Sequence, residues 1–598
     1  MAEQTNLEKQ VEQLIEQVNT LTLRVFVLER NATQSAAHPD PLAAPPARHP
    51  PENEPGELPI AGNSLLPRMA SVCFLLVIAL GLRTMTDSAV LNPRIGSLLG
   101  MVYASALIFS SGILYARQNI LAPIFNFCGA VLMFSVILET HTHFEAFPKE
   151  VAYLLMALTG IGLAFISHAR RVASPILTGT LGMCLAGVAL DFPAPYFPYL
   201  ALLLWLANIL GFFASRIKHC SWLRWLLLGI TLTMLQVWGL RIGLAPLRGE
   251  ALEPLAAGWF LPMAAIISFT YLSISLIGIL RSGEQRISKF DFSLPTVTAC
   301  YGFLVGMYIL KGSTTFSLFI TVVAAGLLAV AYLLSRRQIS RAPGTNSFTL
   351  AGVLLLSFSL PLLFNSLLPA LPILSGLALL IAHLSHKWAS GGMRITSYLL
   401  QVYTAAVLLI ELVGYDAASA ATGAILSAAI CAAAGLAHYR FCRRTPPPAA
   451  SVVFERLDQQ DHSAVAVLLS GLAAGYAMAM FITFQVLRNV FGPSGATAYA
   501  CTQTATINLA AISIMALALN GRNRELRNVA ILIMMVGGAK AFLIDLFSIS
   551  GLGLVISIFS FGIAVSFESF ALSRWQKLDE AQQKQQSESE PQRAATRT

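Results

Sequence analysis

The chain has 598 residues, of which 56% are hydrophobic and 12% are charged, and its formal net charge is +9. An ordinary soluble domain carries roughly twice that charged fraction, so the composition excludes this class. The basic residues flank apolar runs rather than forming a patch with interleaved aromatics, which argues against nucleic-acid binding. The eight cysteines form no CxxC pair. We therefore expect neither a disulfide framework nor a zinc site, and no cofactor is indicated.

Residues 1–30 predict a cytoplasmic coiled coil. Valine and leucine alternate at spacings of four and three from Leu7 to Leu28. Leucine then occupies the d positions and valine the a positions, which favours a parallel dimer, so we expect self-association through residues 7–28. The alternative is a single amphipathic helix lying on protein or on lipid. Residues 31–67 are rich in proline and predict an extended linker.

Long apolar runs make up most of the remaining chain. They recur from Arg68 to Arg574, and a run of about 20 apolar residues crosses a bilayer as a helix. We expect about eighteen such spans, which gives an all-α fold, a polytopic bundle of transmembrane helices arranged as nine hairpins. The predicted spans are 69–87, 94–116, 120–139, 150–168, 174–190, 196–214, 221–240, 258–280, 290–310, 316–334, 347–364, 367–384, 395–413, 417–437, 463–487, 495–519, 527–547 and 549–572.

The predicted spans fall into two membrane regions. Residues 68–442 hold about fourteen spans, and residues 463–573 hold about four. A cytoplasmic joint at 443–462 separates them. The segment 574–598 is rich in Gln, Glu and Ser, and this composition predicts a disordered tail.

Basic residues alternate along the chain. Every second joint is rich in lysine and arginine, as in Arg216, Lys218 and Arg224, whereas the joints between them carry few basic residues. The positive-inside rule assigns the basic joints to the cytoplasm. Both ends of the chain are then predicted to be cytoplasmic. A single missed span would shift the basic joints to the opposite side in the rest of the chain, and the alternation shows no such shift.

Two hairpins resemble those of a known family. The closing hairpin contains Lys540-Ala-Phe-Leu-Ile-Asp545-Leu, then Ser550-Gly551-Leu, then Ser557-Ile-Phe-Ser-Phe-Gly562, and the first contains Asp87-Ser-Ala-Val-Leu-Asn-Pro93-Arg94-Ile-Gly96 and then Gly100. These stretches, and the plan of coiled coil, linker and many hairpins, resemble the bacterial predicted membrane proteins of domain of unknown function 2339. The chain departs from that family at Leu554, where a basic residue is usual. The resemblance implies a multi-pass protein of the bacterial inner membrane, but it implies no catalytic residue.

Ionisable residues near the predicted outer ends of spans are the first functional lead. Charge in hydrocarbon is costly and tends to mark function, whereas interfacial pairing and snorkelling are the alternative. These residues predict one polar cluster that would bind an ion or a small polar ligand. The pair His141 and His143 also raises metal binding, on weak evidence. The cluster comprises Arg83, Asp87, Glu139, His141, His143, Glu145, Glu411, Asp416, Lys540 and Asp545.

The sixteenth predicted span is the second lead, because it is unusually polar. Its hydroxyl and amide side chains either bond neighbouring helices or line a wet cavity, and Gln236 and Gln401 pose the same question singly. Prolines between the eleventh and twelfth spans suggest broken helices around a transport site, or else an ordinary kink. The residues concerned are Thr502, Gln503, Thr504, Thr506 and Asn508, and Pro361, Pro369 and Pro372.

The sequence leaves three functions open. No P-loop, HExxH, GxSxG or dinucleotide fingerprint is present, and we do not expect an enzyme. A membrane scaffold or envelope-associated assembly protein is the first hypothesis, and a transporter or channel-like protein for an ion or small polar solute is the second. An intramembrane enzyme acting on lipid-linked substrates is the third. A polar cavity reaching mid-membrane would favour transport.

Overall fold

The computed structural model describes residues 65–88, 92–192, 196–217, 221–248, 254–282, 287–310, 312–336, 344–413, 421–448, 454, 458–492, 496–549 and 551–595. These residues form helices and no strand. The chain divides into two units, Met1–Ala70 and Ser71–Thr598. The predicted coiled coil (1–30) and the predicted linker up to residue 64 lie outside the described residues.

The helices of the described residues follow one another with short connections. In chain order they are α2 (Leu65–Asp87), α3 (Pro93–Ala116), α4 (Ala122–Thr142), α5 (Lys149–Arg170), α6 (Ser174–Asp191), α7 (Phe197–Ile217), α8 (Ser221–Arg248), α9 (Pro254–Ser282), α10 (Lys289–Leu310), α11 (Thr314–Arg336), α12 (Thr345–Leu363), α13 (Ala370–Lys387), α14 (Gly391–Val413), α15 (Ala421–Arg444), α17 (Ala464–Phe491), α18 (Ala496–Gly521), α19 (Arg524–Lys540), the π-helical turn η3 (Ala541–Asp545), α20 (Leu546–Ser548) and α21 (Leu552–Ala595).

The all-α membrane fold is confirmed. Seventeen helices of the described residues are long and apolar enough to cross a membrane, and α2 contributes a shorter apolar stretch at Val77–Thr86. Each of them coincides with one predicted span, since α19, η3 and α20 together form the run Arg524–Ser548. The chain is therefore a multi-pass membrane protein. The reason for the agreement is that an apolar run in lipid must satisfy its own backbone hydrogen bonds, which only a helix does locally.

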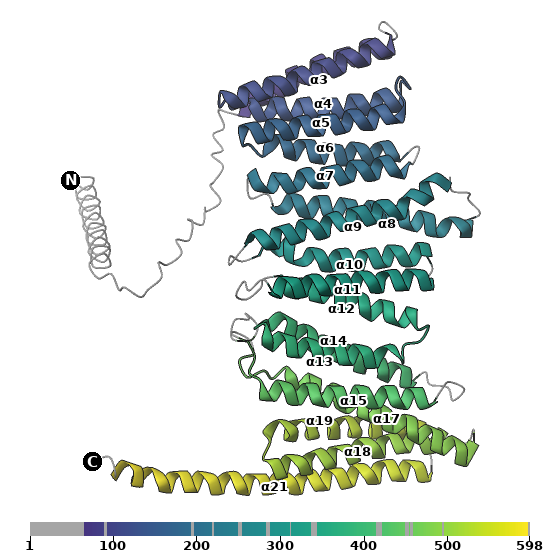
Figure 1. Ribbon diagram of the computed structural model, residues 1–598, viewed down its shortest axis with the longest axis vertical. Helices are drawn as coiled ribbons and strands as arrows, with labels where there is room; N and C mark the ends of the chain where they lie inside the picture. Colours follow the sequence, from purple (N-terminus) through teal and green to yellow (C-terminus); the bar gives the residue numbers. More distant parts are fainter. Residues whose placement is uncertain are drawn as a thin grey trace, which may run out of the picture. The chain divides into compact units, whose positions relative to one another are not determined.

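The helices of the second unit pack largely against their neighbours in sequence. The pairs α3 with α4, α11 with α12 and α15 with α17 are in extensive contact, and α18 contacts both α19 and α21. Figure 1 shows α3 to α15 following one another in a row, with α18, α19 and α21 at its other end. The first and the last helices of this unit therefore lie far apart.

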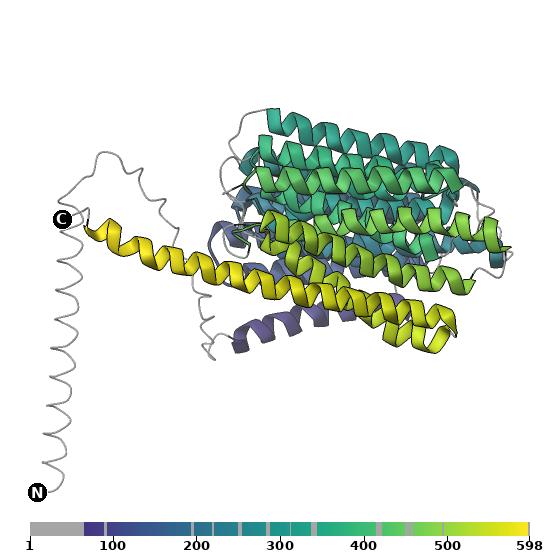
Figure 2. The same ribbon diagram turned by 90° about the horizontal axis from the view of Figure 1, so that it is seen from below.

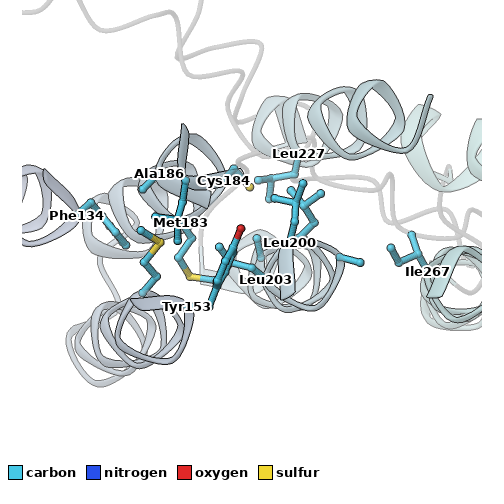
Figure 3. Packing of buried hydrophobic residues seen from close by; sticks show 14 of the residues in the cluster. Phe134, Tyr153, Met183, Cys184, Ala186, Leu200, Leu203, Leu227 and Ile267 are labelled. Atoms are coloured by element: carbon cyan, nitrogen blue, oxygen red, sulfur yellow. The ribbon is translucent and has the colours of Figure 1, made fainter. Parts of the chain in front are cut away.

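The largest core cluster extends from α3 to α10. Tyr153, Met183 and Leu203 come from the three successive helices α5, α6 and α7 and are buried in this cluster. Figure 3 shows these side chains converging between the helices. Their contact gives the hairpins a shared interior, which in lipid forms through packing rather than through exclusion of water.

One sequence expectation is corrected, and the two alternatives for the proline region are resolved. The segment predicted as a disordered tail, 574–598, continues α21 as one helix to Ala595, and Figure 2 shows this helix extending past its neighbours. Its Gln, Glu, Lys and Ala residues favour helix, and the preceding span already supplies the nucleus. The proline region is an ordinary turn. Pro361 lies in the last turn of α12, and Pro369 caps α13, so the two helices are complete.

Candidate functional site: polar clasps and an apolar cavity

The predicted outer charge cluster does not form as one site. Arg83 pairs with Glu139 at 2.8 Å, and Lys540 pairs with Asp545 at 2.8 Å. The first pair joins α2 to α4, and the second lies at the end of α19, at opposite ends of the row of helices (Figure 1). Packing in chain order separates early spans from late ones, so these residues form separate pairs, which is the alternative of interfacial pairing rather than one cluster.

The Arg83–Glu139 pair borders a small cavity. Its volume is about 50 Å³, and polar residues in its wall are Thr86, Ser97 and Thr140. A void of this size holds about one or two waters. The side chain of Asp87, which was predicted to join this cluster, lies outside the described residues.

The remaining members of the predicted cluster do not assemble. The Nδ1 atom of His141 is 2.9 Å from the carbonyl oxygen of Phe147, and the His143 ring packs against Phe144. Glu145 has a left-handed backbone in the same loop, and Glu411 is half-buried near the end of α14. Asp416 lies outside the described residues. Within the part of the chain that is described, no three His, Cys, Asp or Glu side chains are placed to hold a metal ion.

The polar residues of the sixteenth span divide between bonds within α18 and bonds to neighbouring helices. Thr502 and Thr506 donate to carbonyls one turn earlier in α18. The Asn508 amide donates to the Ser560 hydroxyl of α21 at 2.9 Å, and Gln503 is half-buried. Gln401 behaves in the same way, since it exchanges hydrogen bonds with Ser375 between α14 and α13. This arrangement favours helix bonding over a wet cavity.

Thr504 connects the sixteenth span to the Lys540–Asp545 pair. Its hydroxyl donates to Asp545, and the Lys540 ammonium donates to the Thr504 hydroxyl at 2.9 Å and to the Ala500 carbonyl at 3.1 Å. The π-helical turn η3 joins residues five apart and so brings Lys540 beside Asp545. Asp545 is fully buried, so this clasp fixes the end of α19 against α18.

The most extensive polar cluster centres on Arg394, in the first turn of α14. Arg394 is fully buried and pairs with Asp461 at 2.5 Å. It also donates to the carbonyls of Cys442 (2.9 Å) and Thr445 (3.1 Å), and the Tyr398 hydroxyl bridges it to Asp461. We call these five residues the Arg394 clasp. It joins α14, the end of α15 and the connection to α17.

The sequence does not indicate the Arg394 clasp, because Arg394 has the place of an ordinary basic residue in a predicted cytoplasmic joint. Its partner Asp461 lies 67 residues away, at a spacing with no periodic signal. A sequence clue does exist, in that Arg394 stands within two residues of an apolar run and Asp461 follows a polar joint. Neither fact specifies the pairing.

A second clasp lies between α8 and α10. Arg224 pairs with Asp291, and its guanidinium lies 4.2 Å from the ring centroid of Phe290. Pro295 cannot donate to the Asp291 carbonyl four residues earlier, and the Ser275 hydroxyl of α9 donates to that carbonyl at 2.6 Å. The clasp thus joins three helices.

The ion pairs agree with the charge alternation read from the sequence. Arg224–Asp291, Arg394–Asp461 and Arg443–Glu525 each join two residues from joints predicted on one side of the membrane. Arg83–Glu139 and Lys540–Asp545 each join two residues predicted on the other side. None of these five described pairs joins a residue predicted on one side of the membrane to a residue predicted on the other.

Asp458 closes the turn that leads into α17. Its carboxylate accepts from the backbone N–H groups of His462 (2.6 Å) and Ser463 (2.8 Å). Partial burial works to raise the pKa of Asp458, but these hydrogen bonds outweigh it and hold the pKa below its usual value.

We expect Asp458→Ala to lower the free energy of unfolding by about 1 kcal/mol at neutral pH, the usual net worth of side-chain hydrogen bonds to the backbone. Because the pKa of Asp458 is lower in the folded chain, these bonds stabilise the fold above the unfolded pKa of about 4, and their contribution is lost as pH falls through the folded pKa. Unfolding in detergent from pH 7 downward measures this. A difference between the variant and wild type that persists in strong acid would contradict the assignment.

An apolar cavity of about 570 Å³ lies among α8 to α12. Neither α18 nor the turn between α12 and α13 contributes to its lining. A polar cavity lined by Gln503, Asn508 or the proline region would have favoured transport. The cavity among α8 to α12 is apolar and is lined by none of these residues.

Comparison of the chain with protein families, with curated proteins and with solved structures found no match.

Proposed function

We propose that this protein is a non-enzymatic scaffold of the membrane, in which the row of hairpins forms a rigid platform. One observation carries the proposal. Five ion pairs lie at span ends and joints, and several of them bond across helices, as in the Arg394 clasp and in Thr504 with Lys540 and Asp545. Groups used in this way hold helices together.

The resemblance to domain of unknown function 2339 supports the same plan, with residues 7–28 self-associating as a coiled coil on the cytoplasmic side. Both ends of the chain are then cytoplasmic, in the inner membrane of a bacterium, because the basic joints lie inside. Transport of an ion or small polar solute remains the alternative. The small cavity beside Arg83 and Glu139 is the observation that favours it.

Reconstitution of the full chain in liposomes distinguishes these functions. We expect the efflux of potassium, chloride and a small neutral solute to equal that of protein-free liposomes, because the ion pairs at the span ends are engaged with each other. Saturable flux that Glu139→Gln abolishes would overturn the scaffold and establish transport through the Arg83 cavity.

Removal of residues 1–30 tests the assembly part of the proposal. Light scattering in detergent measures the molar mass of the protein. We expect the full chain to be a dimer or a higher oligomer and the truncated chain to contain fewer subunits. A variant carrying Leu14→Pro is the matched control, since proline breaks the helix without removing the segment. An oligomeric state that neither change alters would contradict assembly through the coiled coil.

A further inference from the structure

The membrane-spanning part of α21, Leu552–Leu578, buries one stripe of its surface against α18 and α19. The buried residues recur at spacings of seven, four, three and four, so they lie along one face of the helix, whereas Phe559, Ile563 and Phe570 are exposed on the opposite face. The buried residues are Ser557, Ala564, Glu568, Ala571 and Trp575. One acidic side chain, Glu568, therefore lies in the packed interior, and it is 1% exposed.

The neighbours of Glu568 follow from the register of α18 and α21. Two contacts between these helices each join residues that are 52 apart, so the helices run parallel. The contacts are the hydrogen bond from Asn508 to Ser560 and the approach of Gly553 to Cys501. At the same register, Glu568 lies level with Met515 and Ala518 of α18, and both of these side chains are fully buried.

The surroundings of Glu568 are apolar. Phe567, Ala571 and Leu572, which flank it on α21, pack into one core cluster with side chains of α17, α18 and α19. The buried members from those helices are Leu468, Ile514, Met515, Val529 and Ala530. Within the described residues, neither carboxyl oxygen of Glu568 has a hydrogen-bond partner.

The titratable groups nearest to this cluster are engaged with other residues. Glu525, in the first turn of α19, pairs with Arg443 of α15 at 2.7 Å and accepts a hydrogen bond from Tyr439 at 3.0 Å. The guanidinium of Arg527 lies 5.0 Å from the ring centroid of Trp575. None of these groups is hydrogen-bonded to Glu568.

The other charged residues of the surrounding helices do not reach Glu568 either. α18 contains no charged residue, and the basic residue of α17, Arg488, lies in its last turn, at the opposite end from this cluster. Lys540 is bonded to Asp545 beyond the other end of the stripe. The remaining basic residues at the near end are exposed, namely Arg440, Arg522, Arg524, Arg574 and Lys577.

These surroundings restrict what Glu568 can bind. A carboxylate without a partner is costly in an apolar interior and in hydrocarbon, whereas the protonated carboxyl carries no charge. A metal cation needs several oxygen ligands, and among the described residues no three His, Cys, Asp or Glu side chains are placed to hold one. A proton needs only the carboxyl itself.

We propose that Glu568 is a proton-binding site, and that the packing of α18, α19 and α21 against one another requires the bound proton. Loss of the proton places an unpaired charge between these helices and loosens α21 from α18. The site makes this end of the membrane unit sensitive to pH. It goes beyond the scaffold function and does not depend on it, because protonation is independent of whether the chain assembles or transports.

Unfolding of the full chain in mixed micelles of mild detergent and SDS, measured as a function of pH, tests the proposal. In the unfolded chain the Glu568 carboxyl contacts water and ionises above about pH 4. Because the folded chain keeps the proton, stability is greatest below that pH and falls as pH rises. We expect the unfolding constant of wild type, relative to that of Glu568→Gln, to rise by up to about tenfold per pH unit between about pH 5 and pH 8.

The infrared spectrum of the folded chain in liposomes is an independent measure of the same proton. At neutral pH, wild type should show the C=O stretching band of a protonated carboxyl, and Glu568→Gln should lack that band. Glu525→Gln is the matched control for both measurements, since Glu525 is a carboxylate paired with Arg443 near the same end of the bundle. This control should keep both the band and the wild-type dependence on pH.

Two results would overturn the proposal. A ratio of the two unfolding constants that does not vary with pH would show that Glu568 releases no proton on unfolding. Equal infrared bands in wild type and Glu568→Gln would show that Glu568 is a carboxylate whose charge is balanced by water or an ion. The first measurement compares slopes rather than absolute stabilities, so a general loss of stability in the variant does not affect it.

Discussion

Arg394→Ala is expected to lower the free energy of unfolding by about 3–5 kcal/mol, the cost of breaking a buried ion pair from one side. The substitution leaves Asp461 buried without its cation and leaves the carbonyls of Cys442 and Thr445 without their donor. Unfolding of the purified chain in mixed micelles of mild detergent and SDS measures the change. Cys442, which is 3% exposed, should also become reactive to a maleimide dye, a local sign that the end of α15 has come loose.

Arg440→Ala is the matched control for that loss. Arg440 lies on the same side, in α15, and its side chain is exposed, so removing it changes the net charge equally and stability by only about 0.5 kcal/mol. The double variant Arg394→Met with Asp461→Leu should recover part of the stability, since no charge stays buried. If Arg394→Ala and Arg440→Ala were equally stable, the clasp would not hold this part of the fold.

Gly435→Leu is expected to have the second largest effect, about 3 kcal/mol of lost stability. α15 and α17 approach so closely at Gly435 and Gly471 that a Cβ atom on Gly435 would lie 2.7 Å from the Gly471 Cα. The neighbour is backbone and has no rotamer with which to move away. The two helices must therefore separate, which opens the core cluster of Ala474, Ala477 and Phe481.

Gly423→Leu on the same helix is the control for Gly435→Leu. Gly423 is exposed, and nothing lies within 4 Å of an added Cβ. Leucine favours helix over glycine by almost 1 kcal/mol, so this variant should be as stable as wild type or slightly more so. Equal destabilisation by both substitutions, measured by the same micelle titration, would show that the close approach of α15 and α17 does not contribute.

The spans could be predicted from sequence because each depends on local properties. An apolar run such as 316–334 becomes α11, Thr314–Arg336, whatever surrounds it, since lipid provides no partner for its backbone. The charge alternation added a second, independent signal along the whole chain. The tail was the exception. Its polar composition resembled disorder, yet the chain continues α21 to Ala595.

The candidate site could be predicted only where its partners are close in sequence. Lys540 and Asp545 are five residues apart, and the sequence marks both as candidate residues at the end of the same span. The sequence also marks Glu139 as a candidate. It does not indicate that Glu139 pairs with Arg83 and lies apart from Lys540. Arg394 and Asp461 stand 67 residues apart, and nothing in either neighbourhood specifies the other.

The sequence by itself determined the fold class and the approximate positions of the apolar spans, seventeen of which the described residues form as helices long enough to cross a membrane. Hydropathy and charge act on each segment separately, and so they can be read without knowing its neighbours. The tertiary structure alone decided that the polar residues clasp helices in separate places, and that an apolar cavity lies among α8 to α12. Both depend on which helix faces meet, and that follows from packing between segments.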